Sequence, residues 1–525
     1  MNFWTYRKTL RLLGVAVPTA ILTGFSGFRV SHVRPGWWYP QAFLKAPNPD
    51  AVDQAAYALA LSGDTVAMGA SLEDSNQTSI TNGTTASADN SASDAGAVYV
   101  YKRTGSNWSQ EAYIKAVNAN AGDWFGATIA LSGDTLVVGA NSESSNLKTI
   151  TNGATASADN SAYTTGAVYV YKRTGTSWAQ EAYIKASNAD PGDYFGTKVA
   201  LDGDTLAVSA PLESSSQVTI TNGTTASADN SLTKSGAVYI YKRTGTAWVQ
   251  EAYIKAPNAG ANDEFGGTAL ALSGDTLVVG VQKEDSNQST ITNGTTASAD
   301  DSFAESGAVY VFKRSGSTWA QEAYIKAPNV GANDTFGFSV DINADTLVVG
   351  AHQEDSNQNT ITNGSTASSN NSSESSGAVY IFKRTGSSWA QEAYLKPSNT
   401  TAYAMFGYSV AVSGDTVLAC APGESSNQRK VWNDPLASTD TSSINSGACY
   451  TFKRKNSTWS QTAYLKASNA DANDYFGFSS VLGNGTAVVG TPFESSNQNT
   501  VTNGPGASSD NSVNRAGAVY IFKAR

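Results

Sequence analysis

The chain has 525 residues and a formal net charge of −10 at pH 7. Hydrophobic residues make up 40% of it and aromatic residues 10%, which is enough for a packed core and excludes an intrinsically disordered or collagen-like chain. The negative charge argues against a nucleic-acid partner and against docking on anionic lipid, and with only His32 and His352 the sequence leaves little for histidine-based catalysis or a zinc site.

The N-terminal segment has the layout of an export signal. Arg7, Lys8 and Arg11 precede an uncharged run over residues 12–28. A membrane-spanning helix needs about 20 apolar residues, so the short run favours a cleaved signal peptide, and an uncleaved anchor is the alternative. We therefore expect residues 1–28 to be a signal peptide or anchor, residues 29–35 a short linker, and the mature protein to be exported, either extracellular or associated with the cell envelope.

A long repeat follows. The motif W-x-Q-x-A-Y-[IL]-K recurs every 70 or 71 residues, at Trp108, Trp178, Trp248, Trp319, Trp389 and Trp459. Such a fixed period indicates a repeat architecture. The sequence of each unit predicts four strands in chain order. The first follows the D-x-F-G motif, the second has a sequence such as L-V-V-G-A, the third has a sequence such as S-G-A-V-Y-V-Y-K-R, and the fourth is the Trp segment. Gly-Asp pairs such as 133–134 predict tight hairpin turns, and Asn-Gly pairs such as 82–83 predict hairpin tips within a polar loop of about 25 residues.

The two ends of the repeat array complement each other. The segment from Trp38 to Ala46 aligns with Trp108 to Ala116, whereas the last unit stops at Arg525 before its fourth strand. In a ring of sheets, an N-terminal strand that completes the last blade leaves no exposed edge. The sequence therefore predicts an all-β, seven-bladed β-propeller of four-stranded antiparallel blades over residues 36–525.

The repeat resembles a known family. Six Phe-Gly pairs, from Phe125-Gly126 to Phe476-Gly477, each precede a Gly-Ala or Ala-Pro type of strand end. This pattern resembles the FG-GAP repeats of integrin-α-type propellers, in particular the bacterial exported ones, and implies a non-catalytic binding propeller used in adhesion or surface recognition. The first unit departs, with Ala55-Ala56 in place of Phe-Gly. The D-x-D-x-D-G calcium loops of the integrin type are absent, so those calcium sites do not carry over.

The polar loops contain recurrent acidic residues, including one Glu per unit after the second strand. Carboxylate and amide oxygens suit calcium (Ca2+), which takes six to eight oxygen ligands. Candidate metal ligands are Glu73, Asp74, Asp89, Glu284, Asp285, Asp300, Glu354 and Asp355. The alternative, which recurrence in every unit favours, is that these side chains bind loop N–H groups and hold the loops in shape. No cofactor other than calcium is expected.

The sixth unit departs most from the repeat. Arg429, Lys430, Trp432 and Asp434 replace the usual loop sequence and form a candidate ligand-binding patch, since Trp and Arg are enriched in binding hot spots; the alternative is local packing. Cys420 and Cys449 replace Gly and Val on neighbouring strands, which predicts a disulfide in an exported protein, with two buried thiols as the alternative. His352 is expected to be an ordinary loop residue.

These features predict an exported, non-enzymatic binding or adhesion protein that recognises a protein or glycan at the cell surface through its long loops. We expect a monomeric propeller without catalytic residues, which contacts a membrane only if the N-terminal segment stays uncleaved. One alternative is a structural surface-layer or scaffold protein, supported by the similarity of the repeats. Another is a polysaccharide-acting enzyme that uses a carboxylate pair such as Glu284 and Asp285, because propellers also host enzymes.

Overall fold

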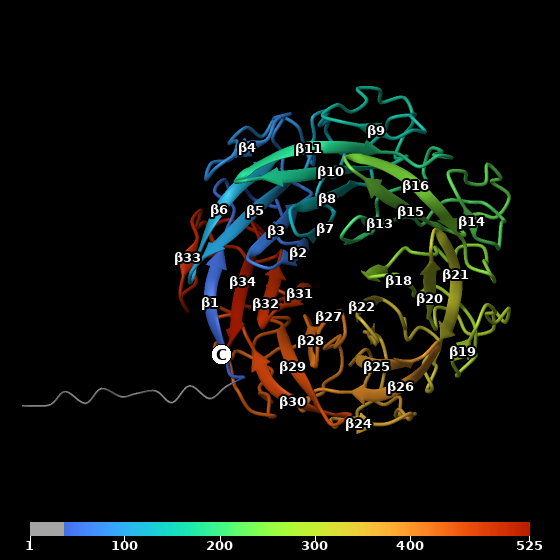
Figure 1. Cartoon of the computed structure of the whole chain (residues 1–525). Coiled ribbons are helices and arrows are strands. Elements are labelled where there is room, and N and C mark those ends of the chain that lie inside the picture. Colours follow the sequence, from blue (N-terminus) through green and yellow to red (C-terminus); the bar gives the residue numbers. More distant parts are fainter. Residues whose placement is uncertain (1–35) are drawn as a thin grey trace, which may run out of the picture.

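The computed structural model of the chain describes residues 36–525, so the expected signal segment 1–28 and the linker 29–35 lie outside the described residues. Seven antiparallel sheets are arranged as blades around a central axis (Figure 1). Blade 1 begins at β2 and blades 2 to 7 begin at β7, β12, β17, β22, β27 and β31. Over residues 36–525, no helix is long and apolar enough to cross a membrane. The predicted seven-bladed propeller is confirmed.

Each blade is built from the axis outward in the same order. The innermost strands are β2 (Ala58–Ser62), β7 (Thr128–Ser132), β12 (Val199–Asp202), β17 (Ala269–Ser273), β22 (Ser339–Asn343), β27 (Ser409–Ser413) and β31 (Ser479–Gly483). The second strands are β3 (Thr65–Ala70), β8 (Thr135–Ala140), β13 (Thr205–Ala210), β18 (Thr276–Val281), β23 (Thr346–Ala351), β28 (Thr416–Ala421) and β32 (Thr486–Thr491). The third strands are β5 (Ala97–Thr104), β10 (Ala167–Thr174), β15 (Ala237–Thr244), β20 (Ala308–Ser315), β25 (Ala378–Thr385), β29 (Ala448–Lys455) and β34 (Ala518–Ala524).

The fourth strands carry the repeated Trp. They are β6 (Asn107–Ile114), β11 (Ser177–Ile184), β16 (Ala247–Ile254), β21 (Thr318–Ile325), β26 (Ser388–Leu395), β30 (Thr458–Leu465) and, in blade 7, β1 (Trp38–Leu44). Six blades add a fifth, two-residue strand at the outer edge: β4 (Thr81–Asn82), β9 (Thr151–Asn152), β14 (Thr221–Asn222), β19 (Thr292–Asn293), β24 (Thr362–Asn363) and β33 (Thr502–Asn503). The predicted four strands are therefore present in every blade, and the long loop supplies one more.

The N-terminal strand closes the ring as predicted. β1 pairs with β34 from Trp38 opposite Ala524 to Leu44 opposite Val519, and Figure 1 shows the first and last strands of the chain side by side. Just after β1, the ammonium group of Lys45 lies 3.0 Å from the carboxylate of Glu494, and both side chains are buried. The closing contact therefore combines a strand pairing with a buried ion pair.

The prediction that Asn-Gly forms a hairpin tip is wrong. The Thr-Asn pair before the glycine adds to the edge of the outer strand, as in β4, which pairs with β6. The Gly83 N–H then donates to the Glu111 carbonyl at 2.7 Å. An uncovered outer strand would present a row of unpaired N–H and C=O groups, and the returning loop satisfies part of that edge.

The same loops join neighbouring blades. Asn82 of blade 1 accepts the Trp178 N–H at 2.7 Å, and its amide lies 3.4 Å from the Trp178 carbonyl. Equivalent Asn–Trp contacts follow at the other blade junctions and include Asn433 with Trp38 and Asn503 with Trp108, which involve the closing strand or the last blade. The two chain ends are thus held by the same contacts as every internal junction.

In blades 2 to 7, the Phe-Gly motif packs the start of the blade against the blade before it. Phe125, at the start of blade 2, is fully buried and meets the ring of Tyr169 edge-on at 5.3 Å between centroids. Gly126 has a φ of +94°, and a Cβ there would lie 2.6 Å from the Ala97 carbonyl oxygen of blade 1. Glycine adopts this positive φ without strain and leaves room for the close approach, which favours the recurrence of the pair, although blade 1 has Ala56 at this position with a φ of +76°.

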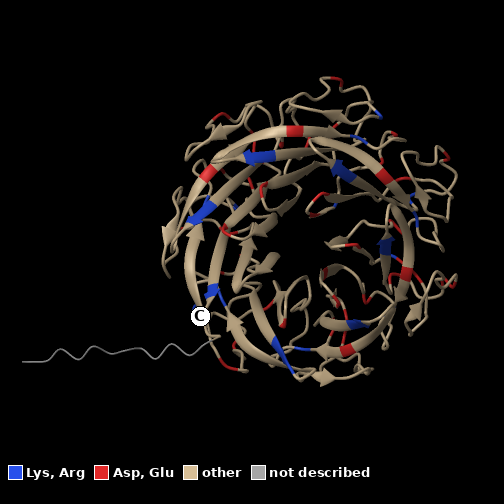
Figure 2. Cartoon of the chain, viewed as in Figure 1, with Lys and Arg blue, Asp and Glu red and all other residues tan. Residues whose placement is uncertain are grey.

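Charged side chains also bridge the blades along their outer strands. Arg173 on β10 lies 2.9 Å from Glu111 on β6, which also accepts the indole N–H of Trp178 at 3.1 Å. Figure 2 shows the pattern as Lys and Arg on the third strands beside Asp and Glu on the fourth. Many of the charges in this part of the ring are therefore paired within the fold.

Cys420 and Cys449 form the predicted disulfide. They lie opposite each other on β28 and β29, with their Cα atoms 4.0 Å apart, and both are buried in the cluster between blades 6 and 7. The bond closes a loop whose ends are 29 residues apart. The chain-entropy relation gives a stabilisation of about 3.5 kcal/mol for a loop of this size.

We expect the double variant Cys420→Gly and Cys449→Val, which restores residues found in other blades, to lose about 3 kcal/mol of unfolding free energy in urea. In the native protein, alkylation of both cysteines should require prior reduction, measured by mass spectrometry. Alkylation of both thiols in the unreduced, denatured protein would contradict the disulfide.

Candidate functional site

The Glu that follows the second strand of each blade is buried and paired. The carboxylate of Glu73 lies 2.8 Å from the Lys115 ammonium and accepts the Tyr113 hydroxyl at 2.7 Å. It also accepts the amide of Asn48, which follows the outer strand of the neighbouring blade, at 3.2 Å. The same pairs recur as Glu143–Lys185, Glu213–Lys255, Glu284–Lys326, Glu354–Lys396, Glu424–Lys466 and Glu494–Lys45. Glu73, Glu284 and Glu354 therefore serve the junctions between blades.

The other candidate metal ligands bind loop N–H groups or hydroxyls. Asp74, Asp285 and Asp355 each accept a main-chain N–H from the end of their own loop, at 2.7 to 2.8 Å. Asp89 and Asp300 accept the hydroxyl groups of Ser91 and Ser302. In the part of the chain that the structure describes, no group of three or more His, Cys, Asp or Glu side chains is placed to hold a metal ion. Calcium binding stays a prediction of the sequence.

A second set of carboxyl groups, absent from the candidates named from the sequence, comes from the Asp of D-x-F-G and from the equivalent Asp53 of blade 1, where the motif is D-Q-A-A. Burial raises the pKa of these aspartates to about 7, although a main-chain N–H donated to the carboxylate opposes the shift. The six residues are Asp53, Asp123, Asp193, Asp263, Asp334 and Asp474, and blade 6 has Ala404 at this position. The motif was visible in the sequence, but its burial was not.

These carboxyl groups predict a stability that falls as the pH rises. Between about pH 4 and pH 7 the folded state keeps protons that the unfolded state has lost. The contribution of these aspartates to the free energy of unfolding therefore falls as the pH rises through this window. Asp123→Asn keeps an acceptor for the N–H but does not titrate. We expect its unfolding free energy, relative to that of the native protein, to increase by roughly 2 kcal/mol when the pH is raised from 5 to 8. Urea unfolding at both pH values measures this.

The control is Asp440→Asn, because loop N–H and hydroxyl donors lower the pKa of Asp440 and it is ionised at both pH values. Its stability relative to the native protein should not change between pH 5 and pH 8. If the difference between Asp123→Asn and the native protein is also constant over this range, Asp123 does not titrate there.

The predicted ligand-binding patch in blade 6 is only partly brought together. Trp432 is partly buried, its ring lies 5.8 Å from that of Tyr464, and its main chain bridges that residue at the outer edge of the blade. Asp434 accepts the Leu436 N–H, and Arg429 and Lys430 are exposed. Trp432 thus replaces the fifth strand of other blades, which is the packing role that the sequence analysis gave as the alternative.

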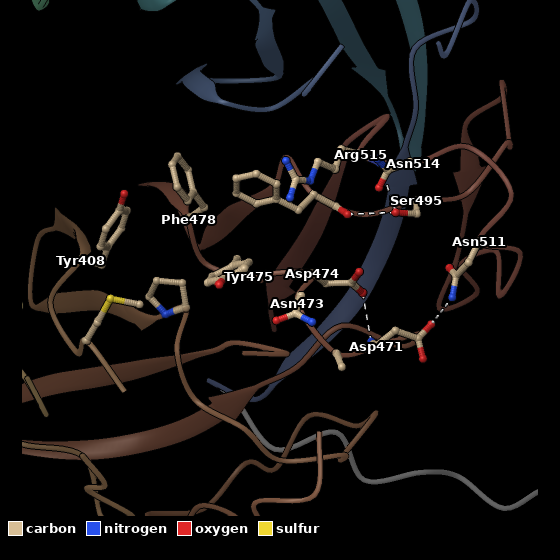
Figure 3. A pocket seen from close by; sticks show the side chains of 14 residues that line it. Tyr408, Asp471, Asn473, Asp474, Tyr475, Phe478, Ser495, Asn511, Asn514 and Arg515 are labelled. Atoms are coloured by element: carbon tan, nitrogen blue, oxygen red, sulfur yellow. Dashed lines mark hydrogen bonds between the residues drawn. The ribbon is translucent and has the colours of Figure 1, made fainter. Parts of the chain in front are cut away.

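A groove lies close to this patch, between the loops of blades 6 and 7. It has a volume of about 710 Å³, and we call it the blade 6–7 groove. Figure 3 shows Tyr408, Phe478 and Tyr475 toward one end of it and Asp471 and Asn511 toward the other. The ring of Phe493 lies 5.3 Å from Tyr475 and 5.7 Å from Phe478. The groove therefore has a continuous aromatic wall.

Polar and charged groups complete the groove. The guanidinium of Arg515 lies 5.3 Å over the ring of Phe493, which suits a cation–π contact. Asp471 accepts the amide of Asn511 at 3.0 Å and pairs with Arg429 at 2.9 Å. The predicted patch thus reaches the groove through Arg429. The groove offers an aromatic wall, a cation, a carboxylate and amides.

Two positions that line the groove vary from blade to blade. In blades 1 to 7, the residue before the buried Glu is Leu72, Ser142, Leu212, Lys283, Gln353, Gly423 and Phe493, and the residue two before the S-G-A glycine is Asp94, Thr164, Lys234, Glu305, Ser375, Asn445 and Arg515. Neither Phe493 nor Arg515 was a candidate from the sequence, because comparison of the seven units shows only that both positions vary. Their proximity in space depends on the long loop returning beside the blade junction.

Comparison with known proteins gives one family. The FG-GAP repeat family matches residues 108–171, 178–241, 248–296, 319–382, 389–452 and 459–522, more than half of the chain. No curated protein matches the chain significantly. Each matched segment begins in the fourth strand of one blade. All of them except segment 248–296 end in the third strand of the next blade, so the family pattern spans the blade junctions. The chain belongs to the FG-GAP repeat family.

Proposed function

We propose that the protein is an exported, non-enzymatic binding or adhesion propeller that holds a protein or glycan of the cell surface in the blade 6–7 groove. The observation that carries the proposal is that Phe493 and Arg515, which occupy two positions that vary from blade to blade, lie together in one groove. The seven blades use their recurrent Glu, Lys, Asn and Trp side chains for structure. Residues that the ring does not require are the better candidates for recognition.

The shape and composition of the groove support this role. Its volume of about 710 Å³ falls in the range of roughly 300 to 1,000 Å³ typical of ligand sites. Aromatic and arginine side chains dominate binding hot spots, and aromatic walls beside amide groups suit both peptide side chains and sugar rings. The groove also contains Asp474, but its raised pKa is shared by five other blades and does not mark it as catalytic.

Retention on surfaces tests the proposal. The mature protein is applied to intact cells, immobilised glycans and matrix proteins, in EDTA and with added calcium. We expect saturable retention on at least one of these surfaces, and loss in EDTA alone would assign a role to calcium. Absence of retention on all of them, for a protein that is folded by circular dichroism, would overturn the binding function.

A scaffold protein is the second candidate. Leu436 and Ile444, in the irregular loop of blade 6, are 63% and 62% exposed, and exposed apolar residues favour association with another surface. Self-assembly through this loop would give a concentration-dependent increase in mass by light scattering. A constant monomer mass together with surface retention would favour the binding function over the scaffold.

A further inference from the structure

A second cavity lies where the innermost strands of all seven blades meet. It has a volume of about 510 Å³ and is lined by the first residues of these strands and the residues just before them. We call it the axial chamber. It is separate from the network of buried Glu–Lys pairs, and it adjoins the blade 6–7 groove only through Tyr408 and Phe478, which line both.

The wall of the axial chamber is aromatic on one side. The residue after the Phe-Gly position is Tyr57, Phe338, Tyr408 or Phe478 in blades 1, 5, 6 and 7, but Ala127, Thr197 or Gly267 in blades 2, 3 and 4. Neighbouring ring centroids are 4.9 Å apart for Phe338 and Tyr408 and 5.1 Å apart for the other two adjacent pairs. The four rings therefore form a continuous arc over the consecutive blades 5, 6, 7 and 1.

Blade 3, outside this arc, carries a lysine. Lys198 is the only charged residue among those that line the chamber within residues 36–525. Burial lowers the pKa of its ammonium group and no nearby charge offsets the shift. Over the same described residues, its ammonium group has neither an ion pair nor a hydrogen bond to the protein. Lys198 is nevertheless partly exposed, and its unpaired ammonium group would be stabilised by an anionic group bound in the chamber.

The position of Lys198 has a structural role in other blades. Ser339, Ser409 and Ser479 occupy it in blades 5, 6 and 7, and each donates its hydroxyl to a carbonyl of the next blade at 2.7 to 2.8 Å. Lysine gives up this contact between blades. Lys198 therefore does not supply this junction contact, which blade 1 also lacks because it has Ala58 at the same position.

We propose that the axial chamber binds the uronic acid residue of an acidic glycan, with the Lys198 ammonium pairing its carboxylate and the arc of Tyr57, Phe338, Tyr408 and Phe478 packing against the sugar ring. A single lysine matches a single carboxylate, whereas a phosphate or sulfate group would favour an arginine fork or several cations. The volume of about 510 Å³ is within the range of sites for small ligands. The protein is acidic overall, which disfavours a polyanion and favours a ligand with one charge at its end.

Calorimetric titration tests the proposal with glucuronate, galacturonate and digalacturonate as probes and glucose as the neutral control. We expect saturable binding of at least one uronate, no saturable binding of glucose, and a weaker affinity at higher salt. Lys198→Thr, which introduces the residue of blades 2 and 4, should weaken uronate binding about tenfold or more. Lys198→Arg should retain part of the affinity.

The matched control is Lys234→Thr, which removes an exposed lysine from a loop of the same blade and should leave uronate binding unchanged. Equal uronate affinity for Lys198→Thr and the native protein would overturn the proposal, as would the absence of uronate binding by the folded native protein. Lys198 lines the axial chamber and not the blade 6–7 groove, whereas Phe493 and Arg515 line only the groove. The Lys198 variants therefore test the chamber, and the retention of variants at Phe493 and Arg515 tests the groove.

Discussion

A mature chain that starts after β1, at Ala46, is expected not to form a stable monomeric ring. β1 contributes the buried side chains of Trp38, Phe43 and Leu44 to blade 7, and burial of each such side chain is worth about 1.5 to 3 kcal/mol. Loss of Lys45 also leaves the buried Glu494 without its partner, at a cost of about 3 to 5 kcal/mol. Together these losses approach the whole stability of a typical protein, about 5 to 15 kcal/mol.

Size-exclusion chromatography and circular dichroism measure this result. We expect the shortened chain to aggregate through the open edge of β34, or to unfold tens of degrees lower than the native protein. A chain that starts at residue 36 is the control and should fold, and a synthetic peptide of residues 36–47 should restore stability to the shortened chain. A soluble monomer of unchanged melting temperature that lacks β1 would show that the ring does not depend on this closure.

Lys326→Met is expected to destabilise the protein by about 3 to 5 kcal/mol, because it leaves the carboxylate of Glu284 buried without its cation. The Glu284 carboxylate would keep the Tyr324 hydroxyl and the Asn258 amide as donors, which cannot neutralise it. Urea unfolding at pH 7 measures the loss. The double variant Glu284→Gln with Lys326→Met removes both charges and should recover part of it.

Lys148→Ala is the matched control, because Lys148 pairs with Asp190 at 3.0 Å but its side chain is half exposed. Surface ion pairs contribute about 0 to 1 kcal/mol, so this variant should stay within about 1 kcal/mol of the native protein. Equal losses for Lys148→Ala and Lys326→Met would show that burial does not determine the strength of these ion pairs.

Much of the fold was predictable from the sequence because one unit is repeated. The spacing of Trp108 and its equivalents predicts the blades, and the match of Trp38 to that series predicts the closure by β1. The substitutions at Cys420 and Cys449 predict the disulfide because both lie on neighbouring strands of one unit. Each of these predictions depends on counting along the chain and not on the course of a loop.

The long loops were less predictable because their partners lie in other units. Nothing within the segment around Asn82 shows that this side chain binds Trp178, 96 residues further along. The acidic residue Glu73 suggests a metal ligand until Lys115 is seen beside it. The two groove residues Phe493 and Arg515 stand at positions that vary between the units, and only the folded loops place the cation over the ring.

The most direct measurement of the proposed function is surface retention of a variant in which the groove takes the residues of blade 2, Phe493→Ser with Arg515→Thr. Its control carries the same two changes at the equivalent positions of blade 3, Leu212→Ser with Lys234→Thr. Both should stay folded, because in each case the new residues occur at these positions in blade 2. We predict that the groove variant loses retention at least tenfold and that the blade 3 variant retains it; full retention by the groove variant would contradict the blade 6–7 groove as the ligand site.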